Sequence, residues 1–283
     1  MVMPQWSVLI LAATPIGNLS DASPRLVEHL QNSKFIAAED TRTLHKLANA
    51  LGIKLNAKLF SLHEHNEGDR VEQMLEIAGT DDLLVVSDAG MPTVSDPGFQ
   101  LVRAAVVANI DVTVIPGPSA VLAALAVSGL PTDRFSFEGF LPRKQGERKR
   151  LFETLLHEQR TMVFFESPHR ILEGLESAAE VFGAERRATV SRELTKKFEH
   201  TERGPLSALV EWAKGEPKGE MVLVIAGAPA RELAAIDVVD QVLELVAAGS
   251  PLKPAVAEIA EAAGVSKGQL YDLVLERRRS ALN

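Results

Sequence analysis

Residues 83–98 read LLVVSDAGMPTVSDPG: four consecutive apolar residues, then twelve in which glycine, proline, alanine and short polar side chains predominate. An apolar run of this length between turn-forming residues is typical of a strand that is buried on both faces. Such strands belong to parallel sheets that helices cover on both sides. The stretch therefore predicts a parallel α/β fold, and its loop is either a long turn or the wall of a ligand site.

Four more apolar runs with similar surroundings occur in the first half of the chain. We expect strands at residues 7–13, 35–38, 59–62 and 112–115, with helices between them. The dipeptide Asp96-Pro97 is typical of a helix start, in which Asp96 caps the helix and the proline occupies its first position. Because strands alternate with helices, the first half is predicted to form a mostly parallel α/β sheet.

The second half continues the alternation with more strands. We expect strands at residues 135–140, 160–165, 188–190 and 221–226, which predicts a second α/β domain with a mixed sheet. After residue 230 the pattern is helical, and Ser266 with Gln269 forms the sequence of a capping box. This tail is either a helix-turn-helix or a small bundle that only packs. The expected domains are residues 1–117, 118–229 and 230–283.

The composition limits the classes of protein that fit. The 283 residues are 46% hydrophobic and 24% charged, as in a soluble globular protein with two domains or one large one. No apolar run reaches the ~20 residues of a membrane span, and no signal-peptide layout is present, so we expect a cytoplasmic protein without membrane association. The absence of cysteine excludes disulfides, thiolate nucleophiles and cysteine-ligated zinc. The net charge of −8 argues against general coating of nucleic acid.

The segment His63-Glu64-His65 invites comparison with a metal site. In a strand, its two histidines would share a face. Because no third ligand is evident, we expect no bound metal.

Three loops are expected at the carboxyl ends of strands, where open α/β sheets bind their ligands. They are Thr14 to Asn18, Ser87 to Gly98, and Pro116 to Ala120, and all are rich in proline, glycine and small polar residues. Small residues let the main chain approach a ligand closely, and proline stiffens a loop. The chain lacks both a G-x-G-x-x-G after its first strand and a P-loop motif. A ligand held mainly by main-chain groups, without a pyrophosphate cradle, therefore fits better.

Eight motifs follow one another along the chain: TPIGNL (14–19), AEDTR (38–42), SDAGMPTVSDPG (87–98), PGPSA (116–120), GFLP (139–142), ESPHR (166–170), RELTK (192–196) and KGE (218–220). Together they resemble the tetrapyrrole methylase superfamily, over about residues 7–228. Within it, they are similar to the enzymes that methylate the ribose 2′-oxygen of a cytidine in small-subunit (16S) ribosomal RNA. One departure is Met91, where the family usually has threonine.

The resemblance implies that S-adenosylmethionine binds, in a folded conformation, in the cleft between the two α/β domains. By motif position, the expected cofactor contacts are Pro15, Asp88, Ala89, Gly90, Met91, Val94, Ser119, Ala120 and Phe165. Asp88 could place its carboxylate near the sulfonium or the amino-acid end, or could cap its own loop. The resemblance also implies a homodimer, with ribosomal RNA, as part of the small ribosomal subunit, as the partner.

A ribose hydroxyl is a poor nucleophile unless a base takes its proton or a cation stabilises the developing charge. The candidate catalytic residues, all near predicted strand ends, are Glu39, Asp40, Glu166, His169 and Glu193. For each acid among them, a helix cap or an ion pair is the alternative role.

Residues 143–150, RKQGERKR, contain five cations among eight residues. One interpretation of this basic segment is the solvated start of a helix. The other is contact with RNA phosphates, because the segment follows the GFLP motif beside the expected cleft. On that interpretation, with exposed side chains in the segment, the RNA contacts are Arg42, Arg143, Lys144, Arg148, Lys149, Arg170 and Lys196.

Two other functions remain compatible with parts of the sequence. A methyltransferase of corrin or porphyrin rings would have an apolar, ring-sized cleft and no need of the basic segment. A non-enzymatic regulator that binds nucleic acid would use the helical tail and leave the cleft without a role. The strongest basic run of that tail is Arg277-Arg278-Arg279. Methyl transfer to ribosomal RNA accounts for both the loops and the basic segment, and is the function that we expect.

Overall fold

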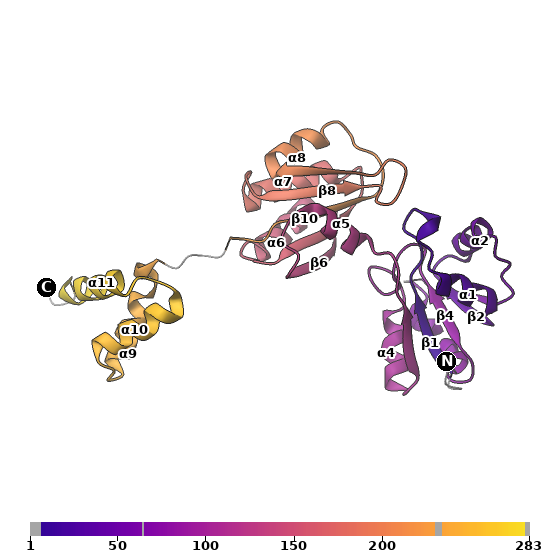
Figure 1. Cartoon of the computed structure of the whole chain (residues 1–283), viewed down its shortest axis with the longest axis horizontal. Helices are drawn as coiled ribbons and strands as arrows, with labels where there is room; N and C mark the ends of the chain where they lie inside the picture. The colour runs from indigo at the N-terminus through magenta and orange to yellow at the C-terminus, as the bar shows by residue number, and fades with distance from the viewer. Residues whose placement is uncertain (1–6, 64, 230–233, 281–283) are drawn as a thin grey trace. The chain divides into compact units, whose positions relative to one another are not determined.

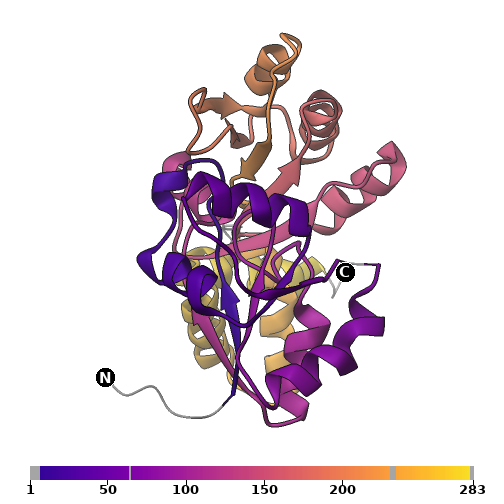
Figure 2. The same cartoon turned by 90° about the vertical axis from the view of Figure 1, so that its right-hand side faces the viewer.

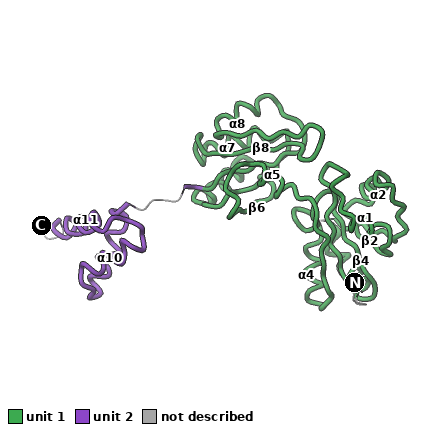
Figure 3. Tube along the Cα trace, in the orientation of Figure 1, with its two compact units in different colours: residues 1–227 green, residues 228–283 purple. Residues whose placement is uncertain are grey.

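The computed structural model describes residues 7–63, 65–229 and 234–280. The chain divides into two compact units, residues 1–227 and 228–283 (Figure 3). The first unit contains both sheets, and the second contains helices alone within its described residues. In these described ranges, no helix combines the length and the apolar character that crossing a membrane requires.

The first sheet has five parallel strands in the order β3-β2-β4-β1-β5 (Figure 1). Its elements are β1 (Val8–Ala12), the 3-10 turn η1 (Leu19–Asp21), α1 (Pro24–Asn32), β2 (Phe35–Ala38), α2 (Thr41–Ala50), β3 (Lys58–Ser61), α3 (Glu67–Ala78), β4 (Leu83–Val86), α4 (Phe99–Val107) and β5 (Asp111–Ile115). Val86 pairs with Ala12 on one side and Ala38 on the other, so β1, β2 and β4 end at one level. The loops that follow these strands therefore share one edge of the sheet, and the predicted parallel α/β sheet is confirmed.

Helices cover both faces of this sheet (Figure 1, Figure 2). Ile10 of β1 packs with Leu26 of α1, whereas its neighbour Leu9 packs on the opposite face with Met74 of α3 and Leu101 of α4. Alternate residues of a strand point to opposite faces, so a continuous apolar run is what a doubly covered strand needs.

The second sheet has the order β6-β7-β10-β8-β9. Its elements are α5 (Ala120–Ser128), β6 (Phe135–Phe140), α6 (Gln145–Thr154), β7 (Thr161–Glu166), α7 (Ile171–Phe182), β8 (Arg187–Arg192), β9 (His200–Pro205), α8 (Leu206–Ala213) and β10 (Met221–Ile225). The pair β6 and β7 is parallel and the other pairs are antiparallel, which confirms the predicted mixed sheet. Helix α5 packs on one face, and α6, α7 and α8 pack on the other.

Helix α4 begins differently from the prediction. Its N-cap is Gly98, with φ +119°, and not Asp96. The carboxylate of Glu67, at the start of α3, accepts hydrogen bonds from the N–H groups of Gly98, Gln100 and Leu101 at 3.1, 2.7 and 3.1 Å. A buried side chain from another helix thus replaces the local cap that the Asp-Pro pair predicts, because it satisfies the free N–H groups of the first turn.

The second unit is helical, as predicted. It consists of η2 (Ala235–Val238), α9 (Val239–Ala247), α10 (Leu252–Ala263) and α11 (Lys267–Ser280), packed around Val242, Val256 and Leu270. Gly264 ends α10 in the left-handed conformation, and Ser266 Oγ accepts a hydrogen bond from Gln269 N at 3.4 Å. That contact is the side-chain half of the predicted capping box.

Candidate active site

A cavity of ≈ 270 Å³ lies where the two sheets of the first unit meet. It is lined by Ile16, Ala89, Asp96, Ala120, Phe140, Phe165, Glu166, Leu194, Glu220, Met221 and Val222. A smaller compartment of ≈ 60 Å³ shares Ile16, Ala89, Asp96, Ala120 and Phe165, and adds Gly90, Met91, Val94, Ser119 and Val121. Because the two share so many walls, we treat them as one two-part site, and call it the cleft.

Hydrogen bonds join the first half of the loop after β4 to the loop after β1. Thr14 N donates to Gly90 O at 2.8 Å, and Gly90 N donates to Thr14 O at 3.1 Å. Thr14 Oγ1 also donates to Ser87 O at 3.2 Å. Gly90 has φ +86°, a conformation that glycine adopts without a steric penalty. This double bridge presents small residues and main chain to the cleft.

The second half of the same loop is held in an uncommon conformation. Thr93 and Ser95 are non-glycine residues with φ values of 76° and 62°. Residues in this left-handed region persist where the surroundings determine them. Here the end of the loop is fixed by Glu67, which binds Gly98 as described above. Asp96, between Ser95 and Gly98, lines the cleft as a result.

The two halves of the first unit touch beside the cleft. A Cβ atom on Gly17 would lie 2.4 Å from Lys196 Cγ, and Asn18 N donates to Thr195 Oγ1 at 3.1 Å. The main-chain oxygen of Leu194 would lie 3.1 Å from the same Cβ on Gly17. Gly17 therefore lies where the loop after β1 closely approaches the second half of the unit.

Aromatic rings form one wall of the cleft. The ring centroid of Phe165 lies 4.8 Å from that of Phe137 and 5.4 Å from that of Phe140. Phe140 is 58% exposed although it is a large apolar residue. An exposed ring next to half-buried ones offers a flat apolar surface to a planar ligand.

Four acidic residues follow β2 and β4: Glu39, Asp40, Asp88 and Asp96. Glu39 Oε2 accepts from Asp88 N, and Asp88 Oδ1 accepts from Asp40 N, both at 3.2 Å. Burial raises the pKa of Glu39 and of Asp88. Burial also raises the pKa of Asp96 to about 6; the charge of Glu39 adds to this rise, and a hydrogen bond with Ser87 opposes it.

The acids predicted as bases have different surroundings. Asp40 caps α2 and pairs with Arg42 at 2.6 Å, and its hydrogen bonds with Arg42 lower its pKa to about 2. Burial alone would raise the pKa of Glu193, but hydrogen bonds from Glu220 N and Lys196 Nζ outweigh it, so this pKa is lowered. Both carboxylates are therefore poor proton acceptors.

Glu166 is the last residue of β7, and His169 follows it in the ESPHR motif. Glu166 lines the cleft, and burial raises its pKa, although it pairs with Arg170 at 2.6 Å. Its Oε2 atom is buried without a hydrogen-bond partner among the described residues. His169 is exposed and does not line the cleft.

The structure brings most of the expected cofactor residues together. Ala89, Gly90, Met91, Val94, Ser119, Ala120 and Phe165 all line the cleft. Pro15 is buried next to Ile16, and Asp88 instead lines a separate hollow with Glu39, Asp40 and Arg42. The sequence did not single out Ile16, Phe140, Leu194 or Glu220 as lining residues. Each of them nevertheless belongs to one of the eight motifs, which was the available signal.

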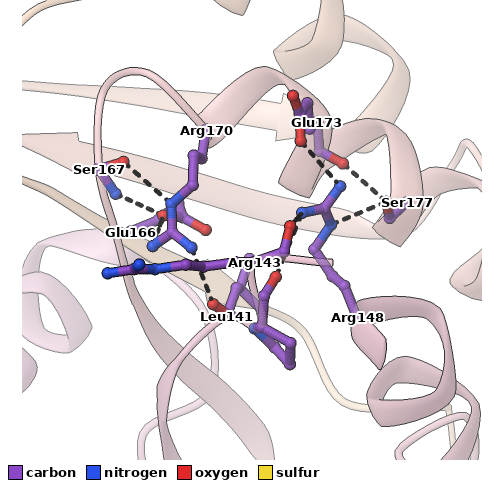
Figure 4. Close-up of polar contacts among 9 residues, drawn as sticks. Leu141, Arg143, Arg148, Glu166, Ser167, Arg170, Glu173 and Ser177 are labelled. Carbon is purple, nitrogen blue, oxygen red and sulfur yellow. Dashed lines mark hydrogen bonds and ion pairs between the residues drawn. The ribbon is translucent and has the colours of Figure 1, made fainter. Parts of the chain in front are cut away.

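The expectation that Arg148 is exposed is wrong (Figure 4). Its side chain is 1% exposed, and Nε donates to Ser177 Oγ at 3.0 Å. Nη1 donates to the carbonyl oxygens of Pro142 and Arg143, and Nη2 lies 3.3 Å from Glu173 Oε2. These contacts join α6 to α7 and leave no group of Arg148 facing solvent.

The other cations of the expected RNA surface are accessible to different degrees. Arg143 and Lys144 are exposed, as is Arg42, whose side chain is 86% exposed. Ion pairs engage Lys149 with Glu180, Arg170 with Glu166, and Lys196 with Glu193 and Glu220.

The rings of His63 and His65 are 6.2 Å apart, and Glu64 lies outside the described residues. Within the part of the chain that the structure describes, no three histidine, aspartate or glutamate side chains are grouped as a metal site would need.

Comparison with known proteins identifies the class. The family model for tetrapyrrole (corrin/porphyrin) methylases matches residues 8–210, and that for the RsmI C-terminal HTH domain matches residues 232–278. The fold is thus that of a tetrapyrrole methylase, a class of S-adenosylmethionine-dependent methyltransferases.

The chain is also similar to curated proteins over nearly its whole length. It is 48% identical over 274 residues to ribosomal RNA small subunit methyltransferase I of Mycobacterium tuberculosis (strain CDC 1551 / Oshkosh), with 96% of this chain and 95% of that protein covered. It is 44% identical to the protein of the same name from Pseudomonas aeruginosa, with 95% and 97% covered. The chain belongs to the ribosomal RNA small subunit methyltransferase I family.

Solved structures share the fold at low identity. The methyltransferase CobJ matches with a TM-score of 0.59 and 19% identity, over 79% of this chain and 95% of that one. Diphthine synthase matches with a TM-score of 0.57 and 15% identity, over 77% and 89%. These likenesses confirm the predicted fold class.

The residues of the cleft fit the cofactor of this class. Ala89, Gly90 and Ala120 leave main chain accessible, and Phe140 and Phe165 offer the apolar surface that a ligand with a planar aromatic ring needs.

Proposed function

We propose that the protein methylates the ribose 2′-oxygen of a cytidine in small-subunit (16S) ribosomal RNA, in the cytoplasm, where the small ribosomal subunit is its partner. The observation that carries the proposal is the similarity to relatives of that name over 95% or more of this chain. The cleft, with a main-chain wall for the cofactor, supports it. On this proposal, Pro15, Asp88, Ala89, Gly90, Met91, Val94, Ser119, Ala120 and Phe165 form the cofactor site.

The chain's own residues would act mainly by positioning. When bound, S-adenosylmethionine supplies a methyl group on a sulfonium, which needs no further activation. The loop after β4 would hold it by main-chain groups, and the contact at Gly17 would fix the second wall of the cleft. Orienting two reactants in this way lowers the barrier without covalent chemistry by the protein.

A direct assay tests the function. The protein would be incubated with labelled S-adenosylmethionine and small ribosomal subunits from a strain that lacks the modification, and the methyl group would be mapped. We expect one labelled cytidine, with the label on the ribose. Label on a base, or on a corrin or porphyrin offered in parallel, would contradict the proposal, and the second result would support the rival small-molecule function.

We expect the exposed part of the basic segment to bind RNA phosphates. The double variant Arg143→Ala/Lys144→Ala, which leaves Arg148 in place, should weaken RNA binding. It should also reduce the slope of log affinity against log salt, by about 0.7–0.9 for each phosphate that the protein no longer neutralises. Melting temperature and cofactor affinity should change little, since both side chains are exposed.

The matched control is Arg25→Ala/Lys54→Ala, which removes two exposed cations elsewhere on the first unit. Filter binding at several salt concentrations measures both variants. If both double variants change the slope of log affinity against log salt equally, RNA binding depends only on net charge. If Arg143→Ala/Lys144→Ala leaves this slope unchanged, the basic segment does not contact RNA. Arg42, Lys149, Arg170 and Lys196 remain further proposed contacts.

We also propose that the protein is a homodimer that covers an apolar face of α4 and β5. Phe99, Val106, Val107 and Val114 are 62%, 62%, 79% and 46% exposed, and β5 is the edge strand of its sheet. Light scattering should report twice the chain mass of 30.6 kDa at micromolar concentration, and Val107→Lys/Val114→Lys should give monomers. A monomeric parent protein would contradict the dimer, because obligate interfaces of about 2,000 Å² stay closed at that concentration.

A further inference from the structure

Asp96 lines both compartments of the cleft. Of the five residues that line both compartments, it is the only one with a titratable side chain. It does not cap α4, because Glu67 serves that helix, and it forms no ion pair with any residue that the structure describes. Its carboxylate is therefore available to a ligand.

The charged groups that face Asp96 are acidic. Glu39 after β2 and Asp88 after β4 face it, together with the hydroxyl of Ser87. Across the cleft, Glu166 is paired with Arg170, and Glu220 is paired with Lys196. Negative neighbours and partial burial disfavour the charged form, so the carboxylate holds a proton more readily than an ordinary aspartate.

The other carboxylates near the cleft are bonded to cations or to main-chain groups. Glu166, whose pKa burial also raises, is paired with Arg170 at 2.6 Å. Asp40 and Glu193 are bonded to Arg42 and Lys196, and the pKa of each is lowered. Glu39 is bonded to Asp88 N and lines the separate hollow.

We propose that Asp96 is the catalytic base, the group that takes the proton of the ribose hydroxyl as the methyl group is transferred. The inference rests on the proposed function, since it assigns a base to a hydroxyl nucleophile. The 2′-oxygen forms its bond to the methyl carbon while its proton passes to a carboxylate oxygen of Asp96. The electron pair of the broken carbon–sulfur bond leaves with sulfur, which becomes a neutral thioether. Protonated Asp96 then returns its proton to water.

The pH dependence follows from the protonation state of Asp96. The base works only when it is ionised, so the rate of methyl transfer should rise with pH and level off above about 6, the pKa that burial and Glu39 give this residue. A base with a pKa near the working pH combines a sufficient ionised fraction with good proton affinity.

The test compares Asp96→Asn, which keeps the shape and removes the basic oxygen, with Asp133→Asn, the same change at an exposed loop position. Single-turnover methylation of unmodified small subunits should fall by about 10²–10⁴-fold in Asp96→Asn and lose the rise near pH 6, whereas Asp133→Asn should match the parent. In carboxyl carbon NMR, the group that titrates near pH 6 in the parent should be absent from Asp96→Asn alone. Calorimetry should find unchanged affinities for S-adenosylmethionine and S-adenosylhomocysteine.

Other outcomes overturn the inference in separable ways. If Asp96→Asn weakens binding of S-adenosylmethionine but not of its neutral product, Asp96 is a charge partner of the cofactor and not a base. A parent-like rate and pH profile in Asp96→Asn would reject the base while leaving the function intact. If the parent protein places no methyl group on ribose, the function itself fails, whatever the variant does.

Discussion

Replacing Glu67 with alanine should lower the free energy of unfolding by about 2–4 kcal/mol and weaken binding of S-adenosylmethionine at least about tenfold. The carboxylate is 5% exposed, and one oxygen accepts three N–H groups, from Gly98, Gln100 and Leu101. Without it, the first turn of α4 loses its cap, and buried N–H groups lose their acceptor. The loop that carries Asp96 then loses its fixed end.

Urea unfolding and calorimetry measure the two effects. The matched control is Glu72→Ala, an exposed position on the same helix, which should change stability by less than about 0.5 kcal/mol. Glu67→Gln keeps an acceptor oxygen but no charge. Its free energy of unfolding and its affinity for S-adenosylmethionine should lie between those of Glu67→Ala and Glu72→Ala. A Glu67→Ala protein with parent affinity for the cofactor would show that the loop holds its conformation without this anchor.

Replacing Arg148 with alanine should destabilise the first unit by about 3 kcal/mol. The change removes a large buried side chain and leaves two carbonyl oxygens, of Pro142 and Arg143, without their donor. Glu173 contributes less to this loss, because its side chain is 60% exposed and its ion pair is screened by water.

Thermal melting measures this loss of stability, with Arg150→Ala as the control. The comparison separates the effect of losing a buried side chain from the effect of losing one positive charge. Both variants remove one arginine from α6, but Arg150 is exposed, so its loss should leave the melting temperature nearly unchanged. Arg148→Lys should recover only part of the stability, because an ammonium cannot reach all the acceptors that the planar guanidinium serves. Equal melting temperatures for the two alanine variants would contradict the structural role.

The central strands β1, β2 and β4 of the first sheet could be predicted because burial on both faces requires continuous apolar runs, as in residues 83–86. The edge strand β9, with the sequence HTERGP, has no such run and is not predicted from the sequence. Helix α8, which follows directly at Leu206, is not predicted either. Strand β9 pairs along one side only, with β8, so polar residues are tolerated there.

Two single residues differ from the prediction: Asp96, which was expected to cap α4, and Arg148, which was expected to be exposed. The Asp96-Pro97 pair predicts a cap, but the cap comes from Glu67, whose role no local pattern reveals. Arg148 was taken for an exposed cation because it stands in a basic run. Its position four residues before the buried Phe152, on the same face of the helix, did indicate burial.

The contact at Gly17 restricts how the protein could be re-engineered. A carbon added at Gly17 would lie 2.4 Å from Lys196 Cγ and 3.1 Å from the main-chain oxygen of Leu194. A designer who wishes to widen the cleft for bulkier acceptors can vary side chains such as Phe140 or Leu194, which line it from one half. The position of Gly17 allows less freedom, because a side chain there would push the loop after β1 away from the other half of the unit.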